Sequence, residues 1–536
     1  MTVRVGSDAT APTARPFDEP GEIEARFEQN DTLSHRTVGA LSWMFVNASG
    51  QIALQITVLA VLARLVSPEQ FGLVAATVIL ITFSEIISDC GIGAALIQRT
   101  RLTDEHIRTA FTLTVLLSIV VWIGVALGAP AIASFFRLPA LTPLIRVGGL
   151  TFVIRSLTVG DFLLARRMQF RALALIELVS YAGYAAVAVL LAARGWGAWA
   201  LVDGQVSQAV IYAALLWIVV PHPRRPCLAR ASVQDLVSYG GGQFLGRIGN
   251  WIAMQGDNFV VGRTLGADAL GLYGRSYAMM SLPANLFGQV ANEVLFPALA
   301  TVQHDREKLR VAFRHSSAVL ALLALPASMV VAVLGDETVR VLLGPSWVAL
   351  EAAFSVMVFG MFFRTSYKLS DSLARATGAV YRRAWRQGAY AAAVVGGAYI
   401  GHWWGIRGVA FGVLAAVITN FLLMAHLALH LVDMSWRTFA IAHTPALILS
   451  ATLVLTVGPT AVALRSVGAP SIVVLACGVI VAITVSVLVI RLAPSLRLTL
   501  LANVVEETLH LVPARAAALA SRLCGPAYAP FDEATL

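Results

Sequence analysis

The chain has 536 residues, of which 58% are hydrophobic and only 13% are charged. A soluble domain averages about 45–50% apolar and about 25% charged residues, so this composition excludes an ordinary soluble protein and indicates a membrane protein. The formal net charge of +9 comes almost entirely from arginine, because lysine occurs only at Lys308 and Lys368. These arginines lie between long apolar runs, which favours contacts with anionic lipid headgroups over binding to nucleic acid.

Neither the four cysteines nor the first residues indicate a secreted or metal-binding protein. The cysteines lie far apart and form no CxxC pair, so we expect neither a disulfide framework nor a zinc site. Residues 1–36 are polar and lack the apolar segment of a cleavable signal peptide. We therefore expect the first apolar run, which begins near Val38, to be an uncleaved membrane anchor.

Long apolar runs fill most of the sequence. A membrane-spanning helix needs about 20 predominantly apolar residues, and fourteen runs approach or exceed this length. The predicted fold class is therefore all-α, a polytopic membrane protein with 14 transmembrane helices. In chain order the predicted helices cover 38–62, 71–97, 110–136, 145–165, 172–193, 198–220, 236–261, 270–299, 316–334, 347–373, 388–404, 408–432, 444–464 and 470–490.

The charges in the connections support this count independently of hydropathy. The even-numbered connections carry 18 arginine and lysine residues, whereas the odd-numbered connections carry 8. Short cytoplasmic loops of membrane proteins carry an excess of these residues. The bias therefore predicts that the even connections and both termini are cytoplasmic.

An internal repeat divides the first twelve predicted helices into two sets of six. The segments 63–76 and 262–275 align at an offset of 199, with arginine, glycine and acidic residues at matching positions. A second pair, 195–204 and 403–412, aligns at an offset of about 208. The alternative is chance similarity between apolar segments.

Two repeats of the same orientation imply a pseudo-twofold axis along the membrane normal, as in many secondary transporters. In the first aligned pair Gly72 falls opposite Gly271, so these glycines mark equivalent places in the two halves. The predicted regions are a cytoplasmic tail (1–36), an N-terminal six-helix bundle (37–222), a C-terminal six-helix bundle (236–432), helices 13 and 14 (440–492) and a cytoplasmic or interfacial tail (493–536).

The sequence holds no recognisable enzyme motif. It contains neither a phosphate-binding glycine loop nor an HExxH or GxSxG motif. We therefore predict a protein that is not an enzyme and holds no cofactor or metal. Ionisable residues inside apolar helices are costly and usually face a water-filled cavity or a partner, so these residues are the candidates for a functional site.

The predicted helix 347–373 is the richest in charge. Arg364, Lys368, Asp371 and Arg375 follow spacings of four, three and four, so they share one face of the helix. Arg364 and Lys368 suit a diphosphate or an acidic sugar, because arginine offers phosphate a bidentate fork and lysine a point charge. The alternative is a structural pair between Lys368 and Asp371, with the two arginines extending toward opposite membrane surfaces.

Two other predicted helices carry further candidates for substrate binding. On 236–261, Arg247 and Asn250 share a face, and a cation beside an amide suits a sugar-phosphate headgroup. Asp257 lies ten residues after Arg247 and close to the same face. In the alternative interpretation, Asp257 only holds its helix in place by pairing with a nearby arginine. Arg155 lies near the middle of the fourth predicted helix and is also a candidate for the cavity.

Embedded carboxylates are candidates for coupling transport to an ion. Glu85 and Asp89 lie four residues apart on one helix face, where two carboxylates favour a shared proton or a bound cation. With Asp257 and Asp371 they form the predicted set for H⁺ or Na⁺ coupling. In the alternative, Asp89 lies at the cytoplasmic helix end near Arg99. The other embedded acidic residues are Asp161, Glu177 and Glu293.

Seven segments between about residues 36 and 430 share their order and motifs with one family of transporters. They are RLVSPEQFGLVA (64–75), DCGIGAALIQR (89–99), RRMQFR (166–171), GWGAWALV (195–202), DNFVVGRTLGADALGLYGRSY (257–277), EVLFPALATVQHDREKLRVAFR (293–314) and LLGPSWVAL (342–350). In this order they resemble the polysaccharide transporter family, which shares a superfamily with the multidrug/toxin extrusion transporters. The likeness is to the exopolysaccharide branch of colanic-acid-like exporters.

The resemblance implies two six-helix bundles around a central cavity that work by alternating access in the bacterial inner membrane. The implied substrate is an undecaprenyl-diphosphate-linked oligosaccharide, and the implied pathway partners are a polysaccharide polymerase and a chain-length regulator. The family has no strict motif that assigns cavity residues, so those rest on helix spacing. Alternatives are a multidrug antiporter, another lipid flippase, and a membrane glycosyltransferase or polymerase, although no odd connection is long enough for the last.

Overall fold

The structure is a computed structural model that describes residues 50–492 except Ile52, 99–102, Met168, 221–224, 291–298 and 301–302. All regular structure in these ranges is helical, as predicted, and they contain no strand. The predicted tails, Glu293 and the first part of the first predicted helix lie outside the described residues. From Gln51 onward the described residues belong to one compact unit.

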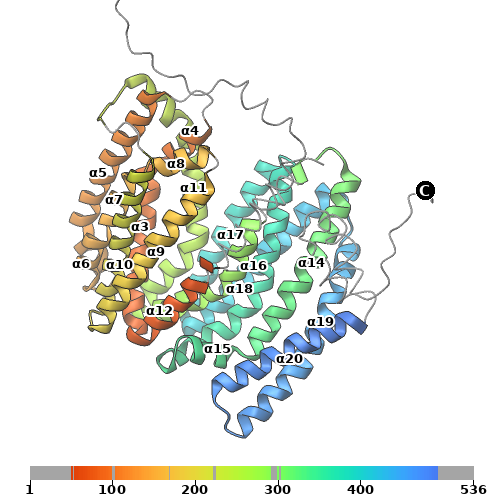
Figure 1. Ribbon diagram of the computed structural model, residues 1–536. Coiled ribbons are helices and arrows are strands. Elements are labelled where there is room, and N and C mark those ends of the chain that lie inside the picture. The colour runs from red at the N-terminus through yellow and green to blue at the C-terminus, as the bar shows by residue number, and fades with distance from the viewer. Residues whose placement is uncertain are drawn as a thin grey trace, which may run out of the picture. The chain divides into compact units, whose positions relative to one another are not determined.

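Helices cover the described part of every predicted apolar run (Figure 1). In the N-terminal half they are Ala53–Leu65, α3 (Pro68–Asp89), α4 (Ile92–Gln98), α5 (Asp104–Phe136), α6 (Leu141–Gly148), α7 (Leu150–Ser156), α8 (Gly160–Arg166), α9 (Phe170–Ala193) and α10 (Ala198–Val219). In the C-terminal half they are α11 (Arg230–Thr264), α12 (Gly266–Val290), α14 (Arg306–Val333), α15 (Gly335–Leu342), η2 (Pro345–Leu350), α16 (Glu351–Ala376), α17 (Val380–Gly401), η3 (His402–Trp404), α18 (Gly405–Leu431), α19 (Trp436–Ser466) and α20 (Ser471–Leu492).

Nine helical segments of the described residues are long and apolar enough to cross a membrane, or ten if the bent run from α6 to α8 is one span. One of these segments, Val380–Leu431, contains both α17 and α18. Although α11 and α12 are 35 and 25 residues long, they are not among the nine, because polar residues interrupt their apolar runs. The protein is thus a multi-pass helical membrane protein, and the count of 14 stays a prediction.

Side-chain caps fix where several helices begin. Ser67 accepts a hydrogen bond from the backbone N–H of Gln70, and the Gln70 side chain accepts one from the backbone N–H of Ser67, so a capping box opens α3. Thr103 and Asp305 cap α5 and α14 with their side chains. Such caps satisfy backbone N–H groups that have no partner within the helix.

The first repeat is visible where α3 meets α12. A Cβ atom added at Gly72 would lie 1.7 Å from the carbonyl oxygen of Ala267, and one added at Gly271 would lie 1.9 Å from that of Pro68. Pro68 and Ala267 are also 199 residues apart, so the two contacts are reciprocal. Reciprocal contacts are what a twofold axis produces, and only glycine lets the two backbones approach so closely.

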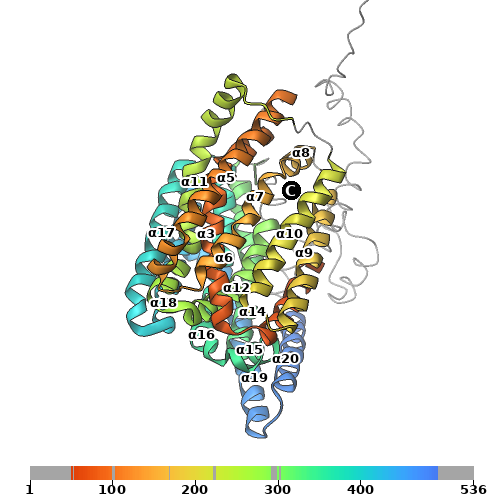
Figure 2. The same cartoon turned by 90° about the vertical axis from the view of Figure 1, so that its left-hand side faces the viewer.

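The second repeat explains two matching helical hairpins. Gly197 and Gly405, which are 208 residues apart, have φ angles of 55° and 69° directly before α10 and at the start of α18. Positive φ is the conformation for which glycine is suited. The turns fold α10 back onto α9 and α18 back onto α17, and Figure 2 shows the two hairpins at opposite sides of the view.

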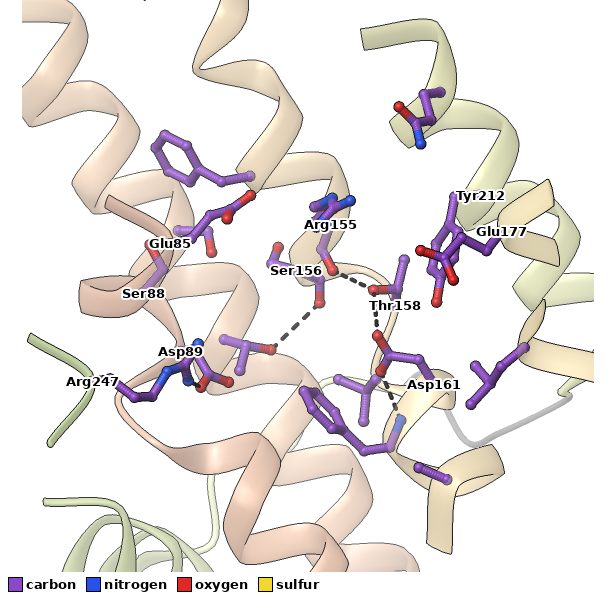
Figure 3. A pocket seen from close by; sticks show the side chains of 18 residues that line it. Glu85, Ser88, Asp89, Arg155, Ser156, Thr158, Asp161, Glu177, Tyr212 and Arg247 are labelled. Atoms are coloured by element: carbon purple, nitrogen blue, oxygen red, sulfur yellow. Dashed lines mark hydrogen bonds and ion pairs between the residues drawn. The ribbon is translucent and has the colours of Figure 1, made fainter. Parts of the chain in front are cut away.

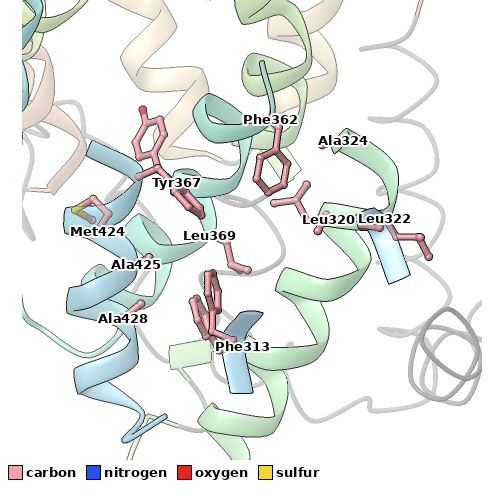
Figure 4. Close-up of a cluster of buried hydrophobic side chains, with 14 of the residues drawn as sticks. Phe313, Leu320, Leu322, Ala324, Phe362, Tyr367, Leu369, Met424, Ala425 and Ala428 are labelled. Atoms are coloured by element: carbon pink, nitrogen blue, oxygen red, sulfur yellow. The ribbon is translucent and has the colours of Figure 1, made fainter. Parts of the chain in front are cut away.

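The interior of the C-terminal half is a continuous apolar core. Phe313 of α14, Phe362 and Leu369 of α16 and Met424 of α18 pack together (Figure 4). The ring of Phe439 from α19 stacks on Phe313 with 6.2 Å between centroids. Since α20 packs on α19 and α15, the two helices beyond the repeat are part of this half.

Candidate functional site

A cavity of about 690 Å³ lies inside the N-terminal half (Figure 3). Helices α3, α5, α7, α8, α9 and α10 line it, and α11 contributes one side chain. Polar groups inside apolar helices are costly unless they face water, each other or a polar ligand. The ionisable side chains of the lining are Glu85, Asp89, Arg155, Asp161, Glu177, Tyr212 and Arg247, and its other polar side chains are Ser88, Thr114, Ser118, Ser156, Thr158 and Gln208.

The first wall of the cavity joins the two halves of the chain. Asp89, the last residue of α3, forms an ion pair with Arg247 of α11. One turn earlier, half-buried Glu85 lies within electrostatic range of Arg155 and Arg247. Trp251 holds α11 against α3 through a 3.0 Å hydrogen bond from its indole N–H to the Thr82 hydroxyl. The first part of α11 therefore completes a cavity of the N-terminal half.

A break in the fourth predicted helix forms the middle of the cavity. The chain bends by 47° between the α6–α7 segment and α8. At the bend the Thr158 hydroxyl donates a 2.7 Å hydrogen bond to the carbonyl oxygen of Arg155, and the Asp161 carboxylate accepts one of 2.7 Å from the N–H of Phe162. The bend thereby presents Arg155 and Asp161 to the same cavity (Figure 3).

The opposite wall comes from the α9–α10 hairpin. Glu177 of α9 lies beside Tyr212 of α10 in Figure 3, and Gln208 is four residues before Tyr212 on the same face of α10. The described lining thus holds four carboxyl groups against two guanidinium groups, and no lysine or histidine. With all of these groups ionised, its formal charge is negative.

The structure brings together four of the nine predicted site residues. Arg155, Arg247, Glu85 and Asp89 line this cavity. The alternative partner of Asp89, Arg99, lies outside the described residues, and in the structure Asp89 pairs with Arg247. Asn250, Arg364, Lys368, Asp257 and Asp371 do not line the cavity.

Arg364 and Asp257 lie in a buried polar cluster of the C-terminal half. Arg364 is only 3% exposed. Its guanidinium donates a 2.6 Å hydrogen bond to the hydroxyl of Tyr390 and lies over the ring of Tyr277. Asp257 is fully buried and accepts a 2.7 Å hydrogen bond from the hydroxyl of Tyr273. Asp257 therefore takes a tyrosine as its partner, not the arginine expected in the alternative interpretation.

The remaining predicted residues have separate surroundings. Asp371 forms ion pairs with Arg375 and Arg383 at 3.3 and 2.5 Å, so the alternative Lys368–Asp371 pair is wrong. Two closer arginines satisfy the carboxylate, and the Lys368 amine lies instead over the ring of Tyr367. Asn250 is exposed on α11.

Among the lining residues outside the predicted set are Asp161, Glu177, Gln208 and Tyr212. Asp161 and Glu177 are acidic residues inside predicted helices, so the sequence identified them as unusual. Neither shares a helix face with another predicted site residue, so spacing gave no reason to assign them to the site. Gln208 and Tyr212 are ordinary polar residues, and only the fold shows that they line the same cavity as Glu177. Within the described ranges, no three His, Cys, Asp or Glu side chains are placed to hold a metal ion.

Comparison with known proteins places the chain in a family. The sequence profile of the polysaccharide biosynthesis protein family matches residues 61–352. The chain is 27% identical over 318 residues to the succinoglycan biosynthesis transport protein ExoT of Rhizobium meliloti, covering 59% of this chain and 64% of that protein. It is 28% identical over 323 residues to the lipopolysaccharide biosynthesis protein WzxC of Escherichia coli, covering 59% and 65%. These matches span just under two thirds of each relative's length.

A third relative is the teichuronic acid biosynthesis protein TuaB of Bacillus subtilis, 23% identical over 65% of this chain and 72% of that protein. Among solved structures, the lipid II flippase MurJ in an inward closed conformation matches with a TM-score of 0.67 at 13% identity, covering 83% of this chain and 98% of that chain. An inward-facing multidrug resistance transporter of the MATE family matches with a TM-score of 0.56 at 17% identity, covering 73% and 94%. At these identities the two structures show a shared fold.

Proposed function

The chain belongs to the polysaccharide biosynthesis protein family, and from this we propose that it is a flippase for lipid-linked oligosaccharides. Its substrate would be an undecaprenyl-diphosphate-linked repeat unit, moved across the bacterial inner membrane by alternating access. The product would supply exopolysaccharide or lipopolysaccharide O-antigen synthesis. The names of the succinoglycan and lipopolysaccharide relatives support this assignment.

The observation that carries the proposal is a polar cavity within a multi-pass helical protein. An oligosaccharide and a diphosphate cannot cross the hydrocarbon core unaided, because each unsatisfied polar group costs several kcal/mol there. The charged, hydroxyl and amide side chains of the cavity offer such a headgroup hydrogen bonds. The lipid chain would remain in the bilayer.

Two contacts between the halves support a motion of one half against the other. Gly72 and Gly271 join α3 to α12 near the start of α3, and Asp89 joins the end of α3 to α11 through Arg247. The two contacts are about 26 Å apart along the helix. Alternating access would open one of them while the other stays closed.

We assign Arg155 to the diphosphate, and Arg247 to it in a state of the cycle in which Arg247 has separated from Asp89. We assign Glu85 and Asp89 to coupling with H⁺ or Na⁺. Five predicted site residues do not line the cavity in this structure, so their proposed roles apply only to another conformation of the transport cycle. In that conformation the proposed substrate contacts are Asn250, Arg364 and Lys368, and the proposed coupling residues are Asp257 and Asp371. The chain would act without a cofactor or catalysis of its own, beside a polymerase and a chain-length regulator. Both termini would be cytoplasmic, in accordance with the loop charges.

The test is complementation of a strain in which the gene has been deleted. We expect the deletion to leave the lipid-linked repeat unit in the inner leaflet and to remove surface polymer, and the intact gene to restore both. Accessibility of the repeat unit to a membrane-impermeant lectin in spheroplasts measures the flipping step without requiring polymerisation. Surface polymer at the parental level in the deletion strain would refute the proposal.

A second candidate, extrusion of cationic drugs, is favoured by the excess of carboxyl groups in the cavity. Such groups attract organic cations as they would attract H⁺ or Na⁺. This function would raise the minimal inhibitory concentrations of cationic dyes when the chain is expressed in a strain that lacks its own exporters. Unchanged concentrations at normal protein abundance would exclude it.

A further inference from the structure

We infer that the cavity selects repeat units whose sugars are uncharged, or carry an ammonium group, over repeat units with uronic acids next to the diphosphate. This inference rests on the proposed function and adds the class of sugar. It comes from the balance and the arrangement of charges around the cavity in Figure 3.

Only one of the two arginines of the lining offers the cavity a positive charge that no described side chain pairs with. The Arg247 guanidinium is already paired with the carboxylate of Asp89. Arg155 is exposed to the cavity and its guanidinium hydrogen-bonds to no described residue, so it is the cation that remains for a diphosphate. Its backbone carbonyl accepts a hydrogen bond from Thr158 at the bend between α7 and α8, and the Asp161 carboxylate lies on the other side of this bend in the same lining.

The wall formed by the α9–α10 hairpin holds hydrogen-bond acceptors for sugar hydroxyl groups. Glu177 is exposed and makes no side-chain hydrogen bond to a described residue, and Tyr212 and Gln208 face the same space. A carboxylate accepts hydrogen bonds from neutral hydroxyl groups or from an ammonium group, and Tyr212 adds a ring against which a sugar can lie. With Asp161, this wall forms the sugar side of the cavity.

A uronic acid would place its own carboxylate on this wall. Like charges a few ångströms apart in a partly dehydrated cavity repel by about 1.4 kcal/mol or more, which corresponds to at least tenfold in affinity. A neutral hexose of the same shape carries a hydroxymethyl group at C6, so it binds without this repulsion. The wall therefore discriminates at C6 of the sugar.

The test compares two polyprenyl-diphosphate-linked disaccharides that differ only at C6 of the first sugar, glucosyl or glucuronosyl. Their affinities for the purified full-length protein are measured by ligand-induced thermal stabilisation. We expect the wild type to bind the glucosyl lipid about tenfold more tightly. In the double variant Asp161→Asn/Glu177→Gln, we expect this preference to fall below about threefold, mainly because the glucuronosyl lipid binds better.

A matched control removes two carboxylates far from the cavity, Glu69→Gln/Asp268→Asn, at equivalent places in the two halves. It should keep the wild-type preference. Equal affinities of the wild type for the two lipids, or an unchanged preference in the Asp161/Glu177 variant, would overturn the inference while leaving the flippase proposal intact. A folded wild type that binds neither lipid would refute the proposed function itself.

Discussion

The two halves of this protein repeat one helical plan but use charge in opposite ways. In the N-terminal half the bend between α7 and α8 opens a cavity, and the guanidinium of Arg155 faces it without a hydrogen bond to a described residue. In the C-terminal half aromatic and aliphatic side chains fill the interior, and the buried guanidinium of Arg364 is held by Tyr390 and Tyr277. An arginine inside a helix therefore marks a binding site only when the protein does not already satisfy it.

The sharpest test of this difference is removal of the buried arginine. Arg364→Ala leaves Tyr390 without its partner and removes the positive charge that acts on fully buried Asp257. We expect a loss of about 3 kcal/mol or more in stability, seen as a lower melting temperature and lower abundance in membranes. Arg407→Ala, at an exposed arginine, is the control. A normal melting temperature for Arg364→Ala would show that the cluster is not structural.

The complementary change is Arg155→Ala in the cavity. Because this side chain is exposed to the cavity, its loss should leave abundance and melting temperature unchanged. If it binds the diphosphate, losing hydrogen bonds to a charged group should lower flipping by about 30- to 100-fold. Arg155→Lys, which keeps a point charge but not the fork, should give an intermediate rate. Wild-type export by Arg155→Ala would remove this residue from the site.

Much of the architecture follows from the sequence. Apolar length located the helices, and the alignment of Gly72 with Gly271 identified equivalent positions in the two halves, which the structure shows to lie in contact. Both are local signals: helix length depends on consecutive residues, and a glycine repeat records a backbone approach that no larger side chain permits. The family resemblance came from motifs of the same kind.

The candidate site was only partly predictable, for a physical reason. Helical spacing shows which residues share a face, but not whether that face meets a cavity or a packed neighbour. Arg364 and Lys368 share a face by spacing, yet Tyr390 and Tyr367 lie against them. Glu177 and Tyr212, far apart in any single helix pattern, meet because the α9–α10 hairpin brings them together.

The contact between the halves offers a smaller but cleaner perturbation. Gly72→Ala places a Cβ atom against the backbone of Ala267, which cannot rotate away. We expect a destabilisation of about 1–3 kcal/mol, the usual cost of overpacking, measured by thermal melting in detergent. Gly124→Ala on α5 is the matched control, since a Cβ there has no neighbour within 4 Å. If the two variants melt alike, α3 and α12 are not in tight contact.

We expect the smallest change in stability at the other contact between the halves, the ion pair between Asp89 and Arg247. Their side chains are 19% and 45% exposed, so water and salt screen the attraction. A double-mutant cycle with Asp89→Asn and Arg247→Gln should give a coupling energy of about 0.2–1 kcal/mol, smaller still at high salt. Disturbing the glycine contact should then cost more free energy than disturbing the ion pair. Since a transporter opens first where opening costs least, this order predicts that the halves separate at the Asp89 end, beside the cavity. A coupling energy larger than the cost of Gly72→Ala would reverse that order and move the predicted opening to the Gly72 end.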